Sequence, residues 1–499
     1  MIKTIAKKPI IWTISGADCS GGAGIAADIK TGHALGVEVC HLITANTVQN
    51  STKLVAINEV SIAVLQQQVD CLLNDKVPDV IKVGLIASTK QITWLVAAIK
   101  QIKYVQPKVQ VVFDPVGQAS VGGKFSAITP QDILPLLAIT DLLTPNLLEA
   151  HQLANCDAAE MTELAEKIIN LGVKQIIIKG GHSGDENTSV DYAYSSITQL
   201  AYQLISPRIN TDYSHGGGCS FASALAAFLA HGYLLRDAFT LAKAFIQQGL
   251  KAQQNKRGVY GAFEQLSWPK NANDFPVVAA QVNQQYAQLP PFKSLGLPRE
   301  GKQTLGLYPV VDSVEWLRRL MPLGIKIIQL RLKQKTAPEL REQIQAAVAL
   351  SKQYQCRLFI NDFWQLAIEY GAYGVHIGQE DLLAADLTAI QQAGLRLGIS
   401  THGCYEFLLA QQLQPSYLAI GAIFPTKTKD MTGQIQGIES LSQTLALASD
   451  IPVVAIGGIT QQRAANVWQT GVDSIAVVTA ITEADDPEKS AQVFQDILT

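Results

Sequence analysis

The chain has 499 residues, of which 48% are hydrophobic and 16% charged. This length exceeds what one hydrophobic core supports, so two α/β domains of ordinary size are expected. The formal net charge is −3, with both signs interspersed and no basic tract or basic–aromatic stripe. This pattern argues against nucleic acid or a membrane surface as a partner.

The N-terminal segment is basic and then apolar only over residues 10–14, where it runs into a glycine-rich stretch. It therefore predicts a first β-strand and not a signal peptide. No apolar run reaches membrane-spanning length. The seven cysteines are scattered and include no CxxC pair. These features favour a cytoplasmic protein without a disulfide framework or a structural zinc site.

Residues 1–267 are assigned to an N-terminal domain in which apolar runs alternate with helix-length stretches. Such alternation predicts a doubly wound, mostly parallel sheet covered by helices on both faces. The expected strands are 10–15, 37–45, 80–84, 109–114, 141–144 and 175–179.

Two glycine-rich loops in this domain each precede a predicted helix. The first is Ser15–Gly24, and the second is His215–Cys219, which is followed by an apolar helix at 220–230. Glycines allow a ligand to approach the backbone closely, and the free N–H groups of a helix start bind phosphate. The same helix end predicts a lowered pKa for Cys219, and hence a thiolate that accepts a proton. Neither loop is a Walker motif.

Asn146 and Glu149 follow a predicted strand and share one face of the next helix. This spacing suits the positioning of magnesium through water, although an ordinary helix start has the same pattern.

Several stretches of this half resemble the ribokinase-like family, specifically hydroxymethylpyrimidine/phosphomethylpyrimidine kinase: ISGADCSGGAGIAADIKT, ITANTVQN, IKVGL, VVFDPV, LLTPNLLEA, IIIKGGH and HGGGCSFASALAA. The resemblance implies ATP-dependent phosphorylation of hydroxymethylpyrimidine and then of its monophosphate. It implies a pyrimidine pocket formed by Gly16, Asp28, Gln49, Leu85 and Val116. It also implies a site for magnesium-ATP and an anion hole formed by Asp114, Asn146, Glu149, Lys179, Gly216, Gly217, Gly218 and Cys219, with Cys219 as the general base.

The sequence departs from the family pattern at three positions. Gly217 replaces the usual threonine of the second loop, Cys19 stands where proline is usual, and Leu85 stands where methionine is common. Two alternatives to the hydroxymethylpyrimidine kinase therefore stay open for this half. One is a catalytically weak pyrimidine sensor, and the other is a kinase that acts on pyridoxine-like alcohols.

Residues 268–303 are rich in Pro, Gln, Asn and Lys and predict a linker with one short helix at 277–288. Residues 304–499 then contain eight apolar runs, separated by helix-length segments such as 337–354 and 383–393. This repeat predicts a compact (β/α)8 TIM barrel. The eight runs are 306–311, 326–332, 357–360, 374–377, 396–400, 417–421, 452–456 and 474–478.

Polar residues follow or end most of these runs, and a barrel brings such positions to one face. Arg331, Lys333 and Lys429 are cations that suit a polyanion, and Asp362 and Asp381 suit magnesium. Glycines after the seventh run offer backbone N–H groups to a phosphate. A histidine at position 376, inside an apolar run, is interpreted as a core or near-site residue, and no role is assigned to the histidine at 402.

The stretches YPVVDSVEWL, QLRLK, LFINDFW, GVHIGQEDL, LGISTH, PTKTK and AIGGI resemble thiamine-phosphate synthase. That family couples the diphosphate of hydroxymethylpyrimidine to thiazole phosphate and releases diphosphate. The resemblance implies magnesium at Asp362 and Asp381. It implies binding of the pyrimidine diphosphate by Gln329, Arg331, Lys333, Asn361, Ser400 and Lys429. It implies binding of the thiazole phosphate by Thr426, Thr428, Gly458, Val478 and Thr479.

Together the two resemblances predict a bifunctional enzyme of thiamine biosynthesis. Arg331, Lys333 and Lys429 are its expected catalytic cations and Cys219 its expected base. Its expected partners are small molecules, with a homo-oligomer possible and neither nucleic acid nor membrane expected.

Overall fold

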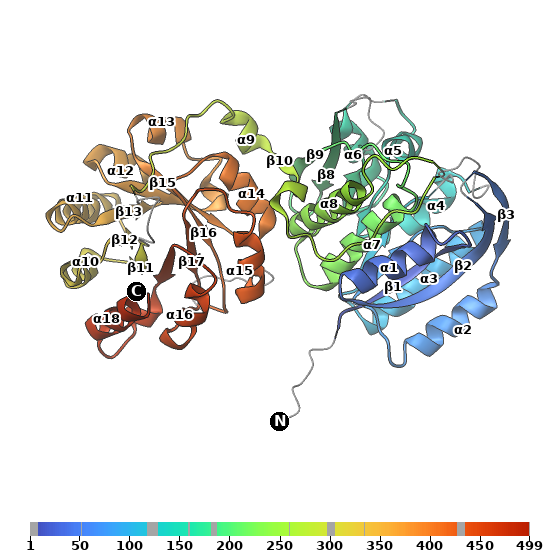
Figure 1. Cartoon of the computed structure of the whole chain (residues 1–499), viewed down its shortest axis with the longest axis horizontal. Helices are drawn as coiled ribbons and strands as arrows, with labels where there is room; N and C mark the ends of the chain where they lie inside the picture. Colours follow the sequence, from blue (N-terminus) through green and yellow to red (C-terminus); the bar gives the residue numbers. More distant parts are fainter. Residues whose placement is uncertain are drawn as a thin grey trace. The chain divides into compact units, whose positions relative to one another are not determined.

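A computed structural model of the chain describes residues 8–50, 52–116, 128–157, 160–180, 187–258, 260–296, 305–333, 335–426 and 435–498. The chain divides into two compact units, Met1–Ala279 and Ala280–Thr499 (Figure 1). Within the described residues, no helix combines the length and the apolar character needed to cross a membrane.

The N-terminal unit is built on a mixed sheet that has ten strands among the described residues, in the order β10-β9-β8-β7-β6-β5-β4-β1-β2-β3. The central strands, from β2 to β7, run parallel, whereas β3, β8, β9 and β10 join antiparallel. The strands are β1 Ile10–Asp18, β2 Glu38–Gln49, β3 Leu54–Glu59, β4 Val80–Val83, β5 Gln110–Phe113, β6 Leu142–Leu143, β7 Gln175–Ile178, β8 Thr188–Ser195, β9 Leu200–Pro207 and β10 Val277–Ala279.

The six expected strands are the parallel core of this sheet, so the predicted doubly wound architecture is confirmed. The four antiparallel strands were not expected. Their sequences alternate or are partly exposed, and they lack the continuous apolar runs that mark strands buried on both faces.

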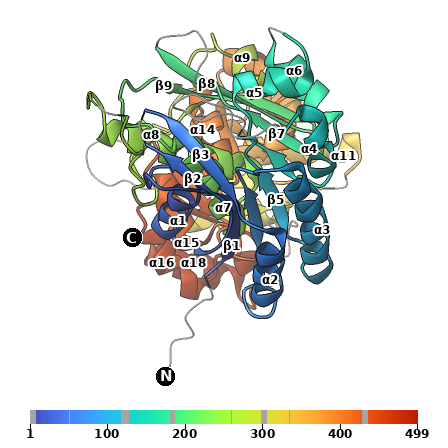
Figure 2. The ribbon, with the colours of Figure 1, turned by 90° about the vertical axis from the view of Figure 1, so that its right-hand side faces the viewer.

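Helices cover both faces of the sheet (Figure 2). On one side α1 and α8 pack against α7, and α7 contacts β4 and β5. On the other side five helices enclose the main core, which includes Ile10, Trp12 and Ile14 of β1. The helices are α1 Gly24–Ala34, α2 Ile62–Leu72, α3 Thr89–Val105, α4 Pro130–Leu137, α5 Leu147–Ala154, α6 Met161–Ile169, α7 Gly217–Ala230 and α8 Leu235–Ala252.

The C-terminal unit is a closed parallel barrel that has eight strands within the described residues. The barrel confirms the predicted TIM fold, and its strands agree with the expected runs to within three residues at each end. The strands are β11 Gly306–Val311, β12 Ile327–Leu330, β13 Arg357–Asn361, β14 Gly374–Ile377, β15 Arg396–Thr401, β16 Tyr417–Ile420, β17 Val453–Ile456 and β18 Ser474–Val477.

Helices surround the barrel strands (Figure 1). The expected helix 383–393 is shorter than predicted, because Asp386 caps its first turn by accepting a hydrogen bond from the amide of Ala389. The helices are α10 Val314–Leu320, α11 Ala337–Gln353, α12 Trp364–Tyr370, α13 Leu387–Gln392, α14 Cys404–Gln412, α15 Gly437–Leu445, α16 Gln461–Trp468, α17 Thr479–Thr482 and α18 Pro487–Ile497, with a 3-10 turn η3 at Gln379–Asp381.

Large aromatic side chains fill the barrel interior, and glycines make room for them. Phe359 and Tyr417 pack edge to face with ring centroids 5.0 Å apart. A Cβ atom on Gly374 would lie 2.5 Å from Phe359, and one on Gly398 would lie 2.2 Å from Tyr417. The pairing of large and small residues across neighbouring strands therefore sets the packing of this core.

The described part of the expected linker is divided between the two units. Its predicted helix at 277–288 becomes strand β10, which pairs with β9, and the short helix α9, Gln281–Gln285. The following segment lies along the amino ends of the barrel strands, where Ser416 Oγ donates to the carbonyl of Lys293 at 2.6 Å. Leu295 is 2% exposed and belongs to the barrel core.

Candidate active sites

The residues expected to form the kinase site lie at the carboxyl ends of the parallel strands. Leu85 follows β4, Asp114 follows β5, Asn146 follows β6 and Lys179 follows β7, while Gln49 ends β2. Ligands of open α/β sheets bind at this edge. The sheet topology therefore brings residues that are far apart in the sequence to a common edge.

The two glycine-rich loops pack directly against each other. Gly216 has a φ of +83°, and a Cβ atom on it would lie 1.8 Å from the carbonyl oxygen of Gly22. Across the same contact, His215 Nε2 lies 2.8 Å from Asp18 Oδ2. Only glycine fits the left-handed backbone at this close approach. The contact joins positions 197 residues apart, which no local pattern could have predicted.

Asp18 organises the first loop and the end of β2. Its carboxylate accepts hydrogen bonds from the amides of Ser20 at 2.8 Å and Ala23 at 2.9 Å. Burial acts to raise the pKa of Asp18, but hydrogen bonds from His215, Gln49 and Ser20 outweigh it and hold the pKa below its ordinary value. The ionised carboxylate thereby fixes the side chain of Gln49 beside the loop.

Cys219 lies in the first turn of helix α7, and its thiol is in a different environment from the one expected. Burial raises the pKa of the Cys219 thiol to about 11, although the positive charge of Lys82 acts to lower it. The expectation of a lowered pKa is therefore wrong, because loss of solvent outweighs the helix end. The amide of Gly24 donates to the sulfur. Within the described residues, the amide of Gly218 forms no hydrogen bond with protein and remains available to an anion.

A buried ion pair lies near Cys219. Lys82 and Asp28 are both 0% exposed, and Lys82 Nζ lies 2.9 Å from Asp28 Oδ2. Thr13 donates to Asp28 at 2.5 Å and Ser223 donates to it at 2.6 Å. Asp28 is thus bonded inside the protein and does not line an open pyrimidine pocket as expected. Lys82 was not expected, although a single lysine within the apolar run VIKV is the signal that could have identified it.

Lys179 connects the predicted ATP site with the second loop. Its Nζ donates to Asp114 Oδ1 at 2.7 Å, and a Cβ atom on Gly218 would lie 3.7 Å from the same Nζ. Burial acts to lower the pKa of Lys179, but the charges of Asp114 and Glu149 raise it overall. Lys179 is therefore a firmly charged ammonium beside the predicted anion hole.

Asn146 and Glu149 form a capping box at the start of α5. Asn146 Oδ1 accepts from the amide of Glu149 at 2.9 Å, and Glu149 Oε2 accepts from the amide of Asn146 at 2.8 Å. The ordinary helix-start interpretation is therefore realised. A role in placing magnesium would use the remaining lone pairs of the same two side chains.

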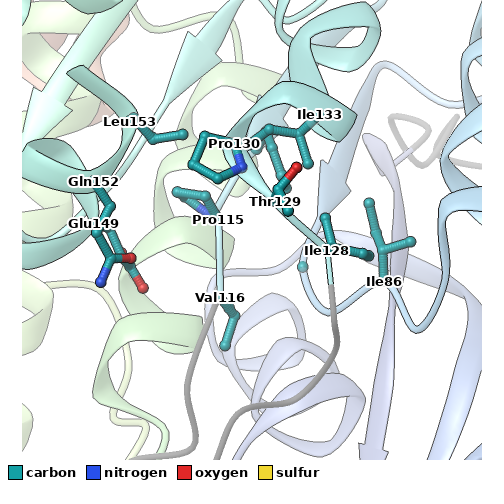
Figure 3. Close-up of a pocket in the computed structure, with 12 residues that line it drawn as sticks. Ile86, Pro115, Val116, Ile128, Thr129, Pro130, Ile133, Glu149, Gln152 and Leu153 are labelled. Atoms are coloured by element: carbon teal, nitrogen blue, oxygen red, sulfur yellow. The ribbon is translucent and has the colours of Figure 1, made fainter. Parts of the chain in front are cut away.

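A pocket of about 100 Å³ opens at the ends of β4 and β5. Phe113 is one of its apolar lining residues. Pro115 and Val116 also line it, with Glu149 and Gln152 on the α5 side (Figure 3). Two residues from the predicted pyrimidine and ATP sets, Val116 and Glu149, therefore share one cavity. The remaining predicted pyrimidine residues Gly16 and Leu85 touch each other, since a Cβ atom on Gly16 would lie 2.5 Å from Leu85.

In the barrel, the predicted site residues lie after successive strands at the carboxyl-terminal face. Arg331 follows β12, Asp362 follows β13, Asp381 ends the turn after β14, Ser400 lies near the end of β15, and Gly458 follows β17. The prediction that they share one face of the barrel is confirmed. Lys333, which follows Arg331 by two residues, is exposed.

Asp362 is held in a strained position with a second carboxylate nearby. Its φ is +63°, its amide donates to the carbonyl of His376 at 2.9 Å, and Asn361 Nδ2 donates to Oδ2 at 2.5 Å. Burial and the charge of Asp381 raise the pKa of Asp362 against the opposing charge of Arg331. Paired carboxylates whose charges repel fit a divalent cation. The described residues contain no group of three or more His, Cys, Asp or Glu able to hold a metal.

The predicted thiazole-phosphate residues are partly described. Thr426 is half-buried. Gly458 has a φ of +62°, and a Cβ atom on it would lie 2.5 Å from the carbonyl oxygen of Pro425, so the two loops touch. Val478 is the N-cap of α17, which begins at Thr479. Thr428 and Lys429 lie outside the described residues.

Sequence reasoning missed the support behind Ser400. Its Oγ lies 2.8 Å from His376 Nε2, and Gln379 Nε2 donates to its carbonyl at 2.8 Å. His376 is buried, as expected for a core or near-site residue. A histidine within the apolar run GVHI was the available signal.

The chain thus joins a doubly wound sheet, with Lys179 and the amide of Gly218 at the carboxyl ends of its strands, to a TIM barrel with Arg331, Asp362 and Asp381 at the corresponding face. Family comparisons match each half. The sequence profile of phosphomethylpyrimidine kinase matches residues 18–263, and that of thiamine monophosphate synthase matches residues 307–481.

Individual relatives extend this result. The thiamine-phosphate synthase of Yersinia pestis (strain Pestoides F) is 56% identical over 189 residues, which are 38% of this chain and 88% of that protein. The thiamine-phosphate synthase of Serratia proteamaculans is 57% identical over 192 residues, which are 38% of this chain and 91% of that protein.

Similar solved structures include a Staphylococcus aureus pyridoxal kinase in complex with AMP-PCP, with 29% identity, a TM-score of 0.47 and coverage of 54% of this chain and 98% of that one. They also include a phosphomethylpyrimidine kinase from Clostridium difficile, with 28% identity, a TM-score of 0.41 and coverage of 48% and 99%. Because these TM-scores lie below 0.5, the assignment rests on the sequence matches.

The chain therefore belongs to the thiamine-phosphate synthase family through its C-terminal half and joins to it a half of the phosphomethylpyrimidine kinase family. It is a bifunctional enzyme of thiamine biosynthesis, and both halves are transferases.

Proposed function

We propose that the N-terminal half phosphorylates hydroxymethylpyrimidine and then its monophosphate, using magnesium-ATP, and that the barrel couples the resulting diphosphate to thiazole phosphate. The observation that carries this proposal is the presence in one chain of both family halves, each with its charged residues at the carboxyl ends of its strands. The product of the first half is then the substrate of the second. A shared chain raises the local concentration of this intermediate.

In the kinase half, Lys179 would neutralise the transferring phosphoryl group while the free amide of Gly218 binds its oxygens. Cys219 would accept the proton of the substrate hydroxyl. The pKa of this thiol is about 11 although the charge of Lys82 acts to lower it, so only a small fraction of Cys219 is thiolate at neutral pH, and this fraction would accept the proton. Asp114, Asn146 and Glu149 would organise magnesium-ATP.

In the barrel, Arg331 and Lys333 would bind the diphosphate and stabilise the charge that develops as it leaves. Lys429 would join them. Asp362 and Asp381 would hold magnesium, which supplies further positive charge to the leaving group. Gly458, Val478 and Thr479 would bind the thiazole phosphate, with Thr426 and Thr428. No protein nucleophile is required.

The same proposal places the enzyme in the cytoplasm, with small molecules as its partners. Its halves use soluble, phosphorylated intermediates, and a charged diphosphate does not cross a membrane unaided.

The whole chain, incubated with hydroxymethylpyrimidine, thiazole phosphate, ATP and magnesium, tests both activities if every pyrimidine species is followed over time. We expect monophosphate, diphosphate and then thiamine phosphate. Cys219→Ala should stop the series at hydroxymethylpyrimidine while added diphosphate is still coupled. Arg331→Ala should instead accumulate the diphosphate. Coupling at a normal rate in Arg331→Ala would contradict the barrel assignment.

A second candidate for the N-terminal half is a pyrimidine sensor with weak catalysis. Gly217 in place of threonine and the raised pKa of Cys219 favour it. Tight binding of hydroxymethylpyrimidine without ADP release would support the sensor. Faster phosphorylation of pyridoxine than of hydroxymethylpyrimidine would instead indicate a kinase for pyridoxine-like alcohols.

A further inference from the structure

A continuous chain of polar side chains crosses the interior of the barrel and joins two of its predicted ligand-binding residues. Gln329 Nε2 lies 3.4 Å from Tyr308 OH, and Tyr308 OH lies 2.8 Å from Tyr417 OH. Tyr417 OH lies 2.7 Å from His376 Nδ1, and His376 Nε2 lies 2.8 Å from Ser400 Oγ. The chain uses side chains from β12, β11, β16, β14 and β15 in turn.

The two tyrosines and the histidine between the ends are buried. Tyr308 is 1% exposed, Tyr417 0% and His376 7%. Burial raises the pKa of both tyrosines, so both keep their protons. Both ring nitrogens of His376 face hydroxyl groups in this buried interior, where a charged ring would lose its solvation, so the ring is neutral. Each hydroxyl therefore has one proton to donate, and the ring has one donor and one acceptor nitrogen.

The direction of hydrogen bonding along this chain follows from the amide at one end. An amide nitrogen can only donate, so Tyr308 accepts from Gln329 and donates its own proton to Tyr417. Tyr417 then donates to His376 Nδ1, which leaves the ring proton on Nε2, directed at Ser400 Oγ. The reverse order would leave the proton of Tyr308 without an acceptor in this chain. A buried donor without a partner costs roughly 1–3 kcal/mol.

This direction determines what each end offers to a ligand. Ser400 Oγ already accepts from His376, so the hydroxyl proton is directed elsewhere and Ser400 acts as a donor. The nitrogen of Gln329 faces the tyrosines, so its carbonyl oxygen acts as an acceptor. An aminopyrimidine is complementary when its exocyclic amino group faces the oxygen of Gln329 and its neighbouring ring nitrogen faces the hydroxyl of Ser400. In that orientation the 4-oxo ring would place its carbonyl against the oxygen of Gln329 and its ring N–H against the proton of Ser400.

We propose that Tyr308, Tyr417 and His376 are positioning residues that fix Gln329 as an acceptor and Ser400 as a donor, so that the barrel selects a 4-aminopyrimidine diphosphate over its 4-oxo counterpart. This inference rests on the proposed coupling activity. It adds to that activity the three buried residues that set its ring specificity without touching the substrate.

The test compares coupling of the 4-amino and 4-oxo pyrimidine diphosphates by the whole chain and its variants. Tyr417→Phe removes the central oxygen and keeps the ring that fills the core. Tyr373→Phe is the matched control, because it removes a barrel hydroxyl that bonds instead to the carbonyl of Leu295. We expect Tyr417→Phe to reduce the ratio of kcat/KM for the two rings by roughly 10²-fold, since a site built to bond a polar group rejects its analogue strongly. Tyr373→Phe should keep the ratio.

A second measurement does not depend on coupling activity. In protein labelled with ¹⁵N-histidine, the ring shifts of His376, assigned with His376→Asn, should report a neutral ring protonated on Nε2. In Tyr417→Phe that preference should weaken. A ring protonated on Nδ1 in the unaltered chain would overturn the inference, as would an unchanged ratio in Tyr417→Phe or an equal loss in Tyr373→Phe. If the expected tautomer is found but neither ring is coupled, the proposed coupling fails instead.

Discussion

At the scale of single residues, both halves place ionisable side chains where burial governs their protonation. Cys219 lies at a helix start, which would ordinarily favour its thiolate, but burial raises the pKa of the thiol to about 11. Lys82 stays charged in full burial, because the carboxylates of Asp28 and Asp114 outweigh the loss of solvent. The protonation of Cys219 in the kinase half therefore depends on its burial and on the buried charges of Lys82 and Asp28.

The raised pKa of Cys219 predicts slow alkylation at neutral pH. In the folded chain, the rate of Cys219 modification by iodoacetamide should keep rising through pH 10, because the reactive thiolate is scarce below the thiol pKa. Peptide mass spectrometry reads each site separately, and the exposed Cys71 serves as the internal control. Modification of Cys219 that is complete before that of Cys71 at pH 7 would show that the thiol is activated after all.

His376 predicts a pH dependence of barrel stability. Its folded pKa of about 3 lies below the ordinary value of 6.5, so the unfolded chain binds a proton that the folded chain does not. Stability is lost as the pH falls from 6.5 toward 3, by about 2 kcal/mol between pH 7 and pH 5 for this one group. Urea unfolding at the two values should show that His376→Asn loses about 2 kcal/mol less than the unaltered chain. An equal loss in both would mean that His376 is protonated in the fold.

At the scale of elements, the fold was predicted where strands are buried on both faces and missed where they are not. The runs of β4 and β12 are entirely buried, and each was recognised. Strand β3 has no buried residue, and the strand β10 at the sheet edge was taken as part of a helix. The pattern of apolar residues in a sequence reflects which residues are buried. An edge strand that is half exposed to solvent lacks the continuous apolar run that marks a buried strand.

The candidate sites were also predicted only in part. The topology places Arg331, Asp362 and Lys179 at strand ends, and strand ends can be recognised in the sequence. The contacts that support them could not be recognised. Asp18 and His215 are 197 residues apart, and Lys82 and Asp28 are 54 apart. Such pairs depend on tertiary packing, which a single sequence does not reveal.

The capping box of α5 allows helix capping to be separated from magnesium positioning. Asn146→Ala should lower stability by about 1 kcal/mol, because the first turn loses its side-chain acceptor. Asn146→Ser retains a capping oxygen and should stay within a few tenths of a kcal/mol of the unaltered chain. If Asn146 also organises magnesium-ATP, both variants should raise the KM for ATP. Thermal unfolding and ATP titration measure the two effects, and a normal KM in Asn146→Ser would leave capping as its sole role.

At the scale of the whole molecule, two compact units carry separate hydrophobic cores. The core of the sheet unit lies between its strands and α2–α6, and the barrel core surrounds Tyr308, Phe359 and Tyr417. Cores that do not share residues respond independently to substitution. A change in one unit should therefore alter one activity and leave the other intact.

Leu295 provides this test, because it is 2% exposed and packs in the barrel core. Leu295→Ala should destabilise the barrel by about 2–5 kcal/mol. Synthase activity should then be lost at a lower temperature while kinase activity keeps its thermal profile. Leu383→Ala is the control, since Leu383 is 51% exposed in the same unit. Parallel loss of both activities in Leu295→Ala would show that the two units unfold together.

The segment just before the first barrel strand has a practical consequence for anyone who wishes to study the synthase alone. Arg357 and Arg396, at the starts of their strands, donate to the carbonyls of Leu295 and Ser294 respectively. This segment therefore covers the amino-terminal end of the barrel. A protein truncated to begin at residue 304 would lack Ser294 and Leu295. The aromatic residues of its barrel core would then be exposed at this end, and the protein would be prone to aggregate. A protein that starts near residue 280 retains this segment.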